Sequence, residues 1–230
     1  MRTARALWQA ARTSMTPPPL GSIASLNASL TIAVFDARSA ADWVPTRPAA
    51  TKAQFTGHPA EIMRGLGKGE EVTTIDVGAS SGFALELEGR SGALEVYRLT
   101  ADTLALVAPP RSWWLDPAHH GAHADAVEAL FAEALDRAGV ADASDLGELE
   151  LESGKLAAVY LWLKKVGAAR DLATTVPSGG AVGFGDGYGE RDGGLIIDLA
   201  PGRYRLCRRE LTAPWADDQA LVTMYLVREP

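Results

Sequence analysis

Short apolar runs separated by turn residues constrain the fold of this chain more than any other feature of its sequence. Between residues 72 and 107, runs rich in β-branched and apolar side chains follow one another at intervals of about ten residues. These runs are 72–77, 83–87, 94–99 and 103–107, with Gly78, Gly89, Gly92 and Asp102 between them. Short strands at this spacing are typical of an antiparallel meander. We therefore expect a protein dominated by antiparallel strands.

The second half of the chain repeats this pattern. Segment 82–99 reads as a strand, a glycine-containing turn and a strand that ends in Tyr-Arg-Leu, and segment 193–206 reads in the same way. The strand expected at 29–36 likewise corresponds to 154–161. We therefore predict an internal duplication. The predicted organisation is a helix or tail over 1–20, a first β half over 21–112, an acidic helical connection over 113–150 and a second β half over 151–230.

One amphipathic helix is expected between the two halves. From 122 to 138, apolar residues fall on one helical face and acidic residues on the others. Asp116 or Asp125 favours the N-terminal end, and Gly139 suits a left-handed C-terminal cap. The expected fold class is therefore α+β, mainly antiparallel β, with two possibly duplicated β halves and a connecting amphipathic helix.

The glycine-rich stretch 183–189 is a candidate ligand loop. Its glycines occur at every second position, which is not the Gly-x-Gly-x-x-Gly spacing, and no Gly-x4-Gly-Lys-Ser/Thr motif occurs in the chain. A β-type run follows it, whereas a dinucleotide fold needs a helix N-terminus against the pyrophosphate. Asp186, Glu190 and Asp192 lack the spacing of a calcium-binding EF-hand loop. We therefore interpret the stretch as a turn between strands and expect no cofactor.

Charge and cysteine content narrow the classes of partner and compartment. The net charge of −7 and the pI near 5.1 argue against nucleic-acid binding, which depends on Lys and Arg. No run approaches the about 18 apolar residues that a membrane span requires. Cys207 is the only cysteine, so no intrachain disulfide can form. A cytoplasmic protein without a membrane or nucleic-acid partner is expected.

The acidic residues gather in one segment beside an aromatic pair. Residues 116–152 hold ten carboxylates and a single base, Arg137. Such a run often forms only a solvated helix face. It would equally attract a basic protein, because complementary fields accelerate encounter and an aromatic anchor holds the complex. The predicted partner-binding residues are Trp113, Trp114, Asp125, Glu128, Glu133 and Asp136.

A histidine cluster provides an alternative. His119 and His123 are four residues apart, so a helix would place both on one face as zinc ligands, with Asp116 or Asp125 as a third donor. The alternative function is a small metal-dependent hydrolase that uses His119, His120 and His123. A solvated helix entry would explain the same residues. A third class, a sugar-binding β module, would depend on Trp113 and Trp114.

Three segments of the C-terminal half resemble a group of bacterial proteins. They are Leu151-Glu-Ser-Gly-Lys-Leu156, Gly183-Phe-Gly-Asp-Gly187 and Leu195-Ile-Ile-Asp-Leu-Ala-Pro-Gly-Arg-Tyr-Arg-Leu206. They resemble β-rich immunity proteins and nuclease inhibitors of toxin–antitoxin and competition systems, many of them uncharacterised. In that group an acidic residue often closes the first strand. Asp36 keeps it here, whereas the second copy has Tyr160-Leu-Trp. The resemblance implies a non-enzymatic protein that neutralises a toxin, and it identifies no binding residue.

Overall fold

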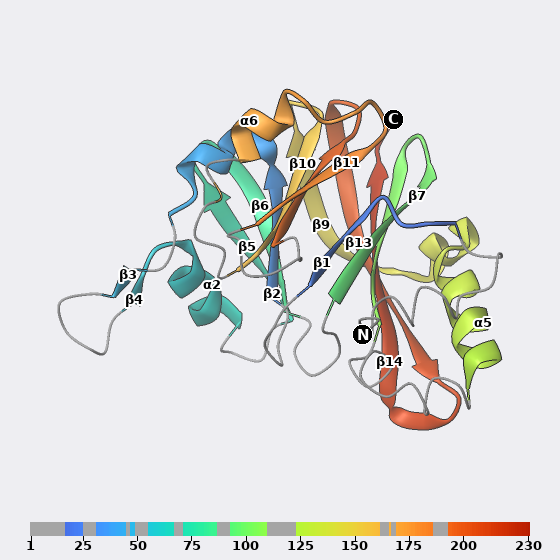
Figure 1. Ribbon diagram of the computed structural model, residues 1–230. Coiled ribbons are helices and arrows are strands. Elements are labelled where there is room, and N and C mark those ends of the chain that lie inside the picture. Colours follow the sequence, from blue (N-terminus) through green and yellow to red (C-terminus); the bar gives the residue numbers. More distant parts are fainter. Residues whose placement is uncertain are drawn as a thin grey trace, which may run out of the picture.

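The computed structural model describes residues 17–24, 31–44, 47–48, 55–66, 71–86, 93–109, 123–161, 166, 169–185 and 193–230. Within these ranges the chain forms two six-stranded antiparallel sheets that pack face to face as a β-sandwich (Figure 1). A few short helices lie against the outer faces of the sheets. The predicted α+β class with mainly antiparallel strands is therefore confirmed.

The strands of the two sheets come from both halves of the chain. Sheet A has the order β1-β7-β8-β14-β13-β9, and sheet B has the order β11-β12-β10-β2-β6-β5. The strands of sheet A are β1 (Gly21–Ala24), β7 (Ala93–Thr100), β8 (Thr103–Ala108), β9 (Ser144–Leu151), β13 (Gly202–Ala213) and β14 (Ala216–Arg228). The strands of sheet B are β2 (Thr31–Asp36), β5 (Val72–Val77), β6 (Ser80–Glu86), β10 (Lys155–Tyr160), β11 (Ala181–Phe184) and β12 (Gly194–Asp198). A short hairpin is formed by β3 (Arg47–Pro48) and β4 (Phe55–Thr56).

Each sheet consists of two matching halves. In sheet A, β1-β7-β8 meets β14-β13-β9 at the β8–β14 pair, and in sheet B, β5-β6-β2 meets β10-β12-β11 at the β2–β10 pair. The strands of the first half correspond in chain order to those of the second half: β1 to β9, β2 to β10, β5 to β11, β6 to β12, β7 to β13 and β8 to β14. With this correspondence, each sheet has the same strand order when it is listed from either edge. A duplicated β unit would produce this arrangement. The two halves share both sheets instead of folding as separate layers.

The match between the halves differs in one detail from that expected from the sequence. Aligning the two Tyr-Arg-Leu motifs equates Tyr97 with Tyr204. However, Tyr97 packs on the outer face of sheet A, whereas Tyr204 points into the core between the sheets. Since successive side chains of a strand point to opposite faces, a shift by one residue reverses every side chain. Positions that are equivalent in the folded strands β7 and β13 are therefore shifted, by an odd number of residues, from the positions that the alignment of the two Tyr-Arg-Leu motifs equates.

The core between the sheets follows the two-residue alternation of the strands. In β2, Ile32 and Val34 point into the sandwich, whereas Ala33 and Phe35 point to the outer face of sheet B. That outer face is covered by η1 (Ala37–Asp42), α2 (His58–Leu66) and α6 (Ala169–Ala173). Because both faces of β2 are covered, its sequence is apolar throughout and does not alternate with polar residues.

Helix α5 (Ala124–Ala134) covers the outer face of sheet A (Figure 1). Its apolar side packs through Val127, Leu130 and Phe131. The hydroxyl of the buried Tyr225 on β14 donates a hydrogen bond of 2.8 Å to the carbonyl oxygen of Ala134. Among the described residues no helix is long and apolar enough to cross a membrane.

The acidic connection between the halves is not helical throughout, which corrects the expectation for 113–150. After α5 the chain forms a short 3-10 helix, η2 (Arg137–Asp142), and then strand β9 at the edge of sheet A. In β9, Leu149 and Leu151 face the core, while Glu148 and Glu150 are exposed. The prediction of a helical connection was wrong here because the carboxylates of 144–151 alternate with core leucines at the two-residue period of a strand. The predicted tail over 1–20 lies, apart from 17–20, outside the described residues.

Candidate functional site

Asp36 fixes the geometry of a polar region at the end of β2. It ends β2, is fully buried and caps η1 by accepting a 2.9 Å hydrogen bond from the Arg38 backbone amide at Oδ1. The backbone amide of Ser153 donates to Oδ2 at 2.9 Å, and the Ser153 hydroxyl donates to Oδ1 at 2.5 Å. A buried carboxylate is tolerated only when such donors replace its hydration. Asp36 thus ties the β9–β10 turn to the end of β2.

This anchor places Arg38 against Glu152. The guanidinium of Arg38 contacts both carboxylate oxygens of Glu152, with Nη2 and Oε1 2.7 Å apart. The shared hydrogen bonds raise the pKa of Arg38 and lower the pKa of Glu152, so both side chains stay charged at neutral pH. A planar, two-point pair of this kind fixes the orientation of both groups.

The turn between β5 and β6 completes the contact. Nε of Arg38 donates to the Ser80 hydroxyl oxygen at 3.5 Å, and the hydroxyls of Ser80 and Ser39 are hydrogen-bonded at 2.8 Å. Both serines are buried. Three segments far apart in the sequence, namely η1, the β5–β6 turn and the β9–β10 turn, therefore meet at Arg38.

A second arginine lies on the neighbouring strand of sheet A. Arg203 on β13 lies directly opposite Glu150 on β9. Its guanidinium is 3.4 Å from a carboxylate oxygen of Glu148 and 3.8 Å from one of Glu150. All of these side chains are more than half exposed, so each ion pair contributes only about 0–1 kcal/mol. One arginine thus faces two carboxylates and leaves an excess of negative charge.

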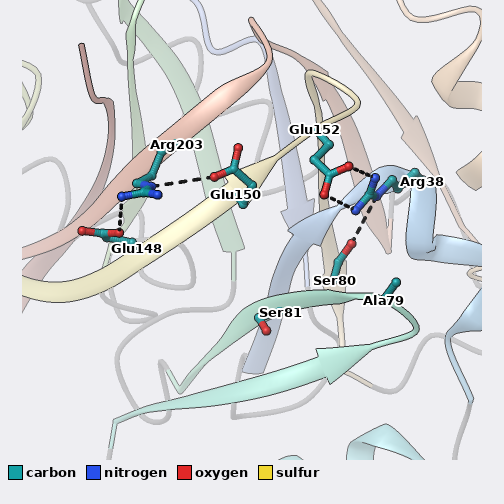
Figure 2. Close-up of a pocket in the computed structure, with 8 residues that line it drawn as sticks. All are labelled: Arg38, Ala79, Ser80, Ser81, Glu148, Glu150, Glu152 and Arg203. Atoms are coloured by element: carbon teal, nitrogen blue, oxygen red, sulfur yellow. Dashed lines mark hydrogen bonds and ion pairs between the residues drawn. The ribbon is translucent and has the colours of Figure 1, made fainter.

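These groups line a cavity between β9 and the β5–β6 hairpin (Figure 2). Its volume is about 340 Å³, and it is open to solvent on one side. Figure 2 shows the glutamates of β9 above Ser80 and Ser81 of the hairpin, with Arg38 and Arg203 at its two ends. The lining residues are Arg38, Ala79, Ser80, Ser81, Glu148, Glu150, Glu152 and Arg203. We refer to this space as the β9 cleft.

The composition of the β9 cleft suits recognition of cations. Its charged side chains are three glutamates and two arginines. Neither histidine, cysteine nor lysine is among its lining residues. Its serines are hydrogen-bonded to neighbouring side chains, Ser80 to Ser39 and Ser81 to an oxygen of Asp76 at 3.0 Å. An ammonium or guanidinium group could enter beside the glutamates and form charge-assisted hydrogen bonds there.

The predicted partner-binding residues on α5 lie elsewhere. Asp125 is exposed, and Glu128 is half-buried on the same helix. Glu133 accepts a 2.6 Å hydrogen bond from Arg209 Nη2, and Asp136 caps η2 by accepting one of 3.0 Å from the Ala138 amide. Glu133 and Asp136 therefore have structural roles within the fold. Trp113 and Trp114 lie outside the described residues.

The predicted metal ligands are only partly described. Asp116, His119 and His120 lie outside the described residues. His123 precedes α5, and its ring stacks on the indole of Trp215 with centroids 4.8 Å apart and an interplanar angle of 4°. In the described part of the chain no three His, Cys, Asp or Glu side chains are grouped so that they could hold a metal ion.

The residues of the β9 cleft are not among those predicted from the sequence, although one pattern indicates them. Glu148, Glu150 and Glu152 occur at every second position, and in a strand this spacing puts all three on one side. The pattern has this meaning only because 144–151 is a strand. The sequence predicts Asp36 as the acidic end of the first strand, but its contact with Ser153 depends on the pairing of β2 with β10.

Comparison with known proteins assigns the chain to no family. No family model matches it, and neither the curated proteins nor the solved structures contain a match.

Proposed function

We propose that the protein is a non-enzymatic binding protein, of the immunity or inhibitor type, that neutralises a basic protein such as a bacterial toxin. The observation that supports this proposal is the β9 cleft, in which three glutamates face two arginines beside an exposed strand. The excess negative charge is held on a rigid sheet edge, so it would steer and orient a cationic surface. The single cysteine, buried at Cys207, is in keeping with the predicted cytoplasmic location.

This proposal moves the expected contact from α5 to β9. The carboxylates of α5 and η2 are partly engaged by Arg209 and by the cap of η2. The three glutamates of the β9 cleft are more than half exposed; Glu148 and Glu150 share Arg203, and Glu152 pairs with Arg38. A partner cation could exchange with these exposed pairs at little cost, because solvent-exposed ion pairs contribute little to folding.

The proposal is tested with the product of the gene adjacent to that of this protein, since a toxin and its immunity protein are expected to be encoded together. The two proteins are co-purified, and their association rate constant is measured by stopped-flow fluorescence at low and at physiological ionic strength. We expect a complex whose association slows at least about fivefold as salt rises, because exposed charges are screened. Absence of a complex, or an association rate that does not depend on salt, would refute the proposed function.

A further inference from the structure

At the β9 edge of sheet A lie backbone groups that no strand within the described ranges uses. The carbonyl oxygen of Arg203 accepts a 2.8 Å hydrogen bond from the amide of Glu229, on the β14 side of β13. In an antiparallel ladder, hydrogen-bonded and non-hydrogen-bonded pairs alternate. Arg203 and its opposite residue Glu150 therefore form a non-hydrogen-bonded pair, and the amide and carbonyl of Glu150 face away from β13. The same holds for Glu148, two residues earlier.

Sheet B extends beyond sheet A at this side of the sandwich. Thr74 and Asp76 on β5 lie directly opposite Phe83 and Ser81 on β6. Opposite residues of a ladder have side chains on the same face. Because Phe83 points into the core between the sheets, Thr74 and Asp76 also point to the inner side of sheet B. Both are nevertheless exposed. Sheet A ends at β9, whose Gly147 lies against the ring of Phe83 on β6. Within the described residues no strand of sheet A covers the inner side of β5 at Thr74 and Asp76, whereas Val72 still packs against the core.

Two ion pairs close the ends of this uncovered strip. At one end Arg208 Nη2 on β13 is 2.6 Å from Glu71 Oε2, immediately before β5. At the other end Arg38 pairs with Glu152 beside the β5–β6 turn (Figure 2). The open edge runs from Glu148 on β9 to Glu152 at the start of the β9–β10 turn, about 17 Å at the rise of a strand. This is room for one strand of about five residues.

The negative charge beside the β9 edge favours one kind of added strand at this edge. Glu148, Glu150 and Glu152 place three carboxylates along this edge. A second copy of β9 would place glutamate opposite glutamate, which is destabilising in a cross-strand pair. An extended segment with Lys or Arg at alternate positions would instead place a cation beside each glutamate.

We propose that β9 receives an extended basic segment of the partner as an added strand of sheet A, over the inner side of β5. Residues directly opposite each other in a ladder have side chains on the same face. The partner residues opposite Glu148 and Glu150 would therefore be the basic ones, and their amides would donate to β9. This inference depends on the proposed function and specifies how the partner is recognised. Strand addition of this kind derives affinity from the backbone and specificity from alternate side chains.

The test uses the full-length protein and a fluorescein-labelled peptide, acetyl-Thr-Lys-Thr-Lys-Thr-Lys-Thr-amide. Its dissociation constant is measured by fluorescence anisotropy for the unmodified peptide, for one N-methylated at the three lysines and for one N-methylated at three threonines. We expect lysine N-methylation to weaken binding at least tenfold, because these amides face β9. Threonine N-methylation should change it less than threefold. Equal effects of the two modifications, or no binding of the unmodified peptide, would overturn the added strand.

A second pair of variants tests the protein side of the same ladder. Glu150→Pro removes both the carboxylate and the backbone N–H group of residue 150. Because this N–H group faces away from β13, no backbone hydrogen bond between β9 and β13 is lost. Glu150→Gln removes the charge and keeps the amide. We expect the proline variant to bind the peptide at least tenfold more weakly than the glutamine variant, with thermal unfolding midpoints within a few degrees of each other. Equal affinities of two folded variants would overturn the proposal.

The outcomes separate this inference from the proposed function. Partner binding that depends on salt, together with no difference between the N-methylated peptides, would retain the proposed function and refute the added strand. A concentration-dependent dimer in sedimentation, abolished by Glu150→Pro, would show that a second copy occupies the edge and would also refute it.

Discussion

Replacing Asp36 by alanine should destabilise the protein more than any other substitution of a polar residue around the β9 cleft. The fully buried carboxylate accepts three hydrogen bonds, from the Arg38 amide and from the amide and hydroxyl of Ser153. Hydrogen bonds to a charged group contribute about 1.5–3 kcal/mol each. Arg38 and Ser153 are exposed, so their released donors can partly bind water. A loss of about 3 kcal/mol in the free energy of unfolding is therefore expected.

The assay is equilibrium urea unfolding followed by tryptophan fluorescence. With an m value of about 2.5 kcal/mol/M, a loss of about 3 kcal/mol lowers the midpoint by roughly 1.2 M. Asp142→Ala is the matched control, because this exposed carboxylate at the end of η2 should change stability by less than about 0.5 kcal/mol. Ser153→Ala should lose about 1 kcal/mol, since it removes one of the three hydrogen bonds. A loss below about 1 kcal/mol for Asp36→Ala would refute the role of Asp36 as the anchor of the cleft.

Three further predictions concern the sandwich itself. Gly147→Ala should lower the free energy of unfolding by about 1–3 kcal/mol, because Gly147 has φ of 129° and an added Cβ would lie 2.9 Å from Phe83 Cζ; an unchanged unfolding midpoint would contradict this. Burial raises the pKa of Tyr225, so its contribution to stability is present below about pH 10 and is lost as the pH rises further. Tyr225→Phe should therefore make the fall in stability at alkaline pH less steep. An equally steep fall in the variant would disprove the assignment. Cys207 is 1% exposed and burial raises its pKa, so a thiol reagent should modify it slowly in the native protein and rapidly in urea; rapid native modification would show that the site opens.

The strands were predictable where the local pattern and the packing agree. β5 was expected over 72–77 and is found there, because turn residues bound a run of mostly β-branched residues. β9 was missed because its exposed face carries a glutamate at every second position, and that composition resembles a solvated linker. In a strand the same residues are an ordinary alternation of core leucines and exposed carboxylates.

The assembly of the site could not be predicted from the sequence. Asp36 and Ser153 are 117 residues apart, and they meet because β2 pairs with β10 at the centre of sheet B. Arg203 lies beside Glu148 and Glu150 because β13 pairs with β9 at the edge of sheet A. These contacts depend on the order of strands. Local propensity and spacing do not determine that order when every strand can pair with several others.

The most direct test of the central claim compares two charge reversals of equal size in the complex with the adjacent gene product. Glu148→Lys combined with Glu150→Lys changes the charge of the β9 cleft, and Asp125→Lys combined with Glu128→Lys makes the same change on α5. The measurement is the association rate constant at low ionic strength. If the β9 cleft receives the partner, the first variant should associate at least about tenfold more slowly and the second about twofold. Equal rates for the two variants, or a larger effect of the α5 variant, would contradict the assignment of the β9 cleft as the binding site.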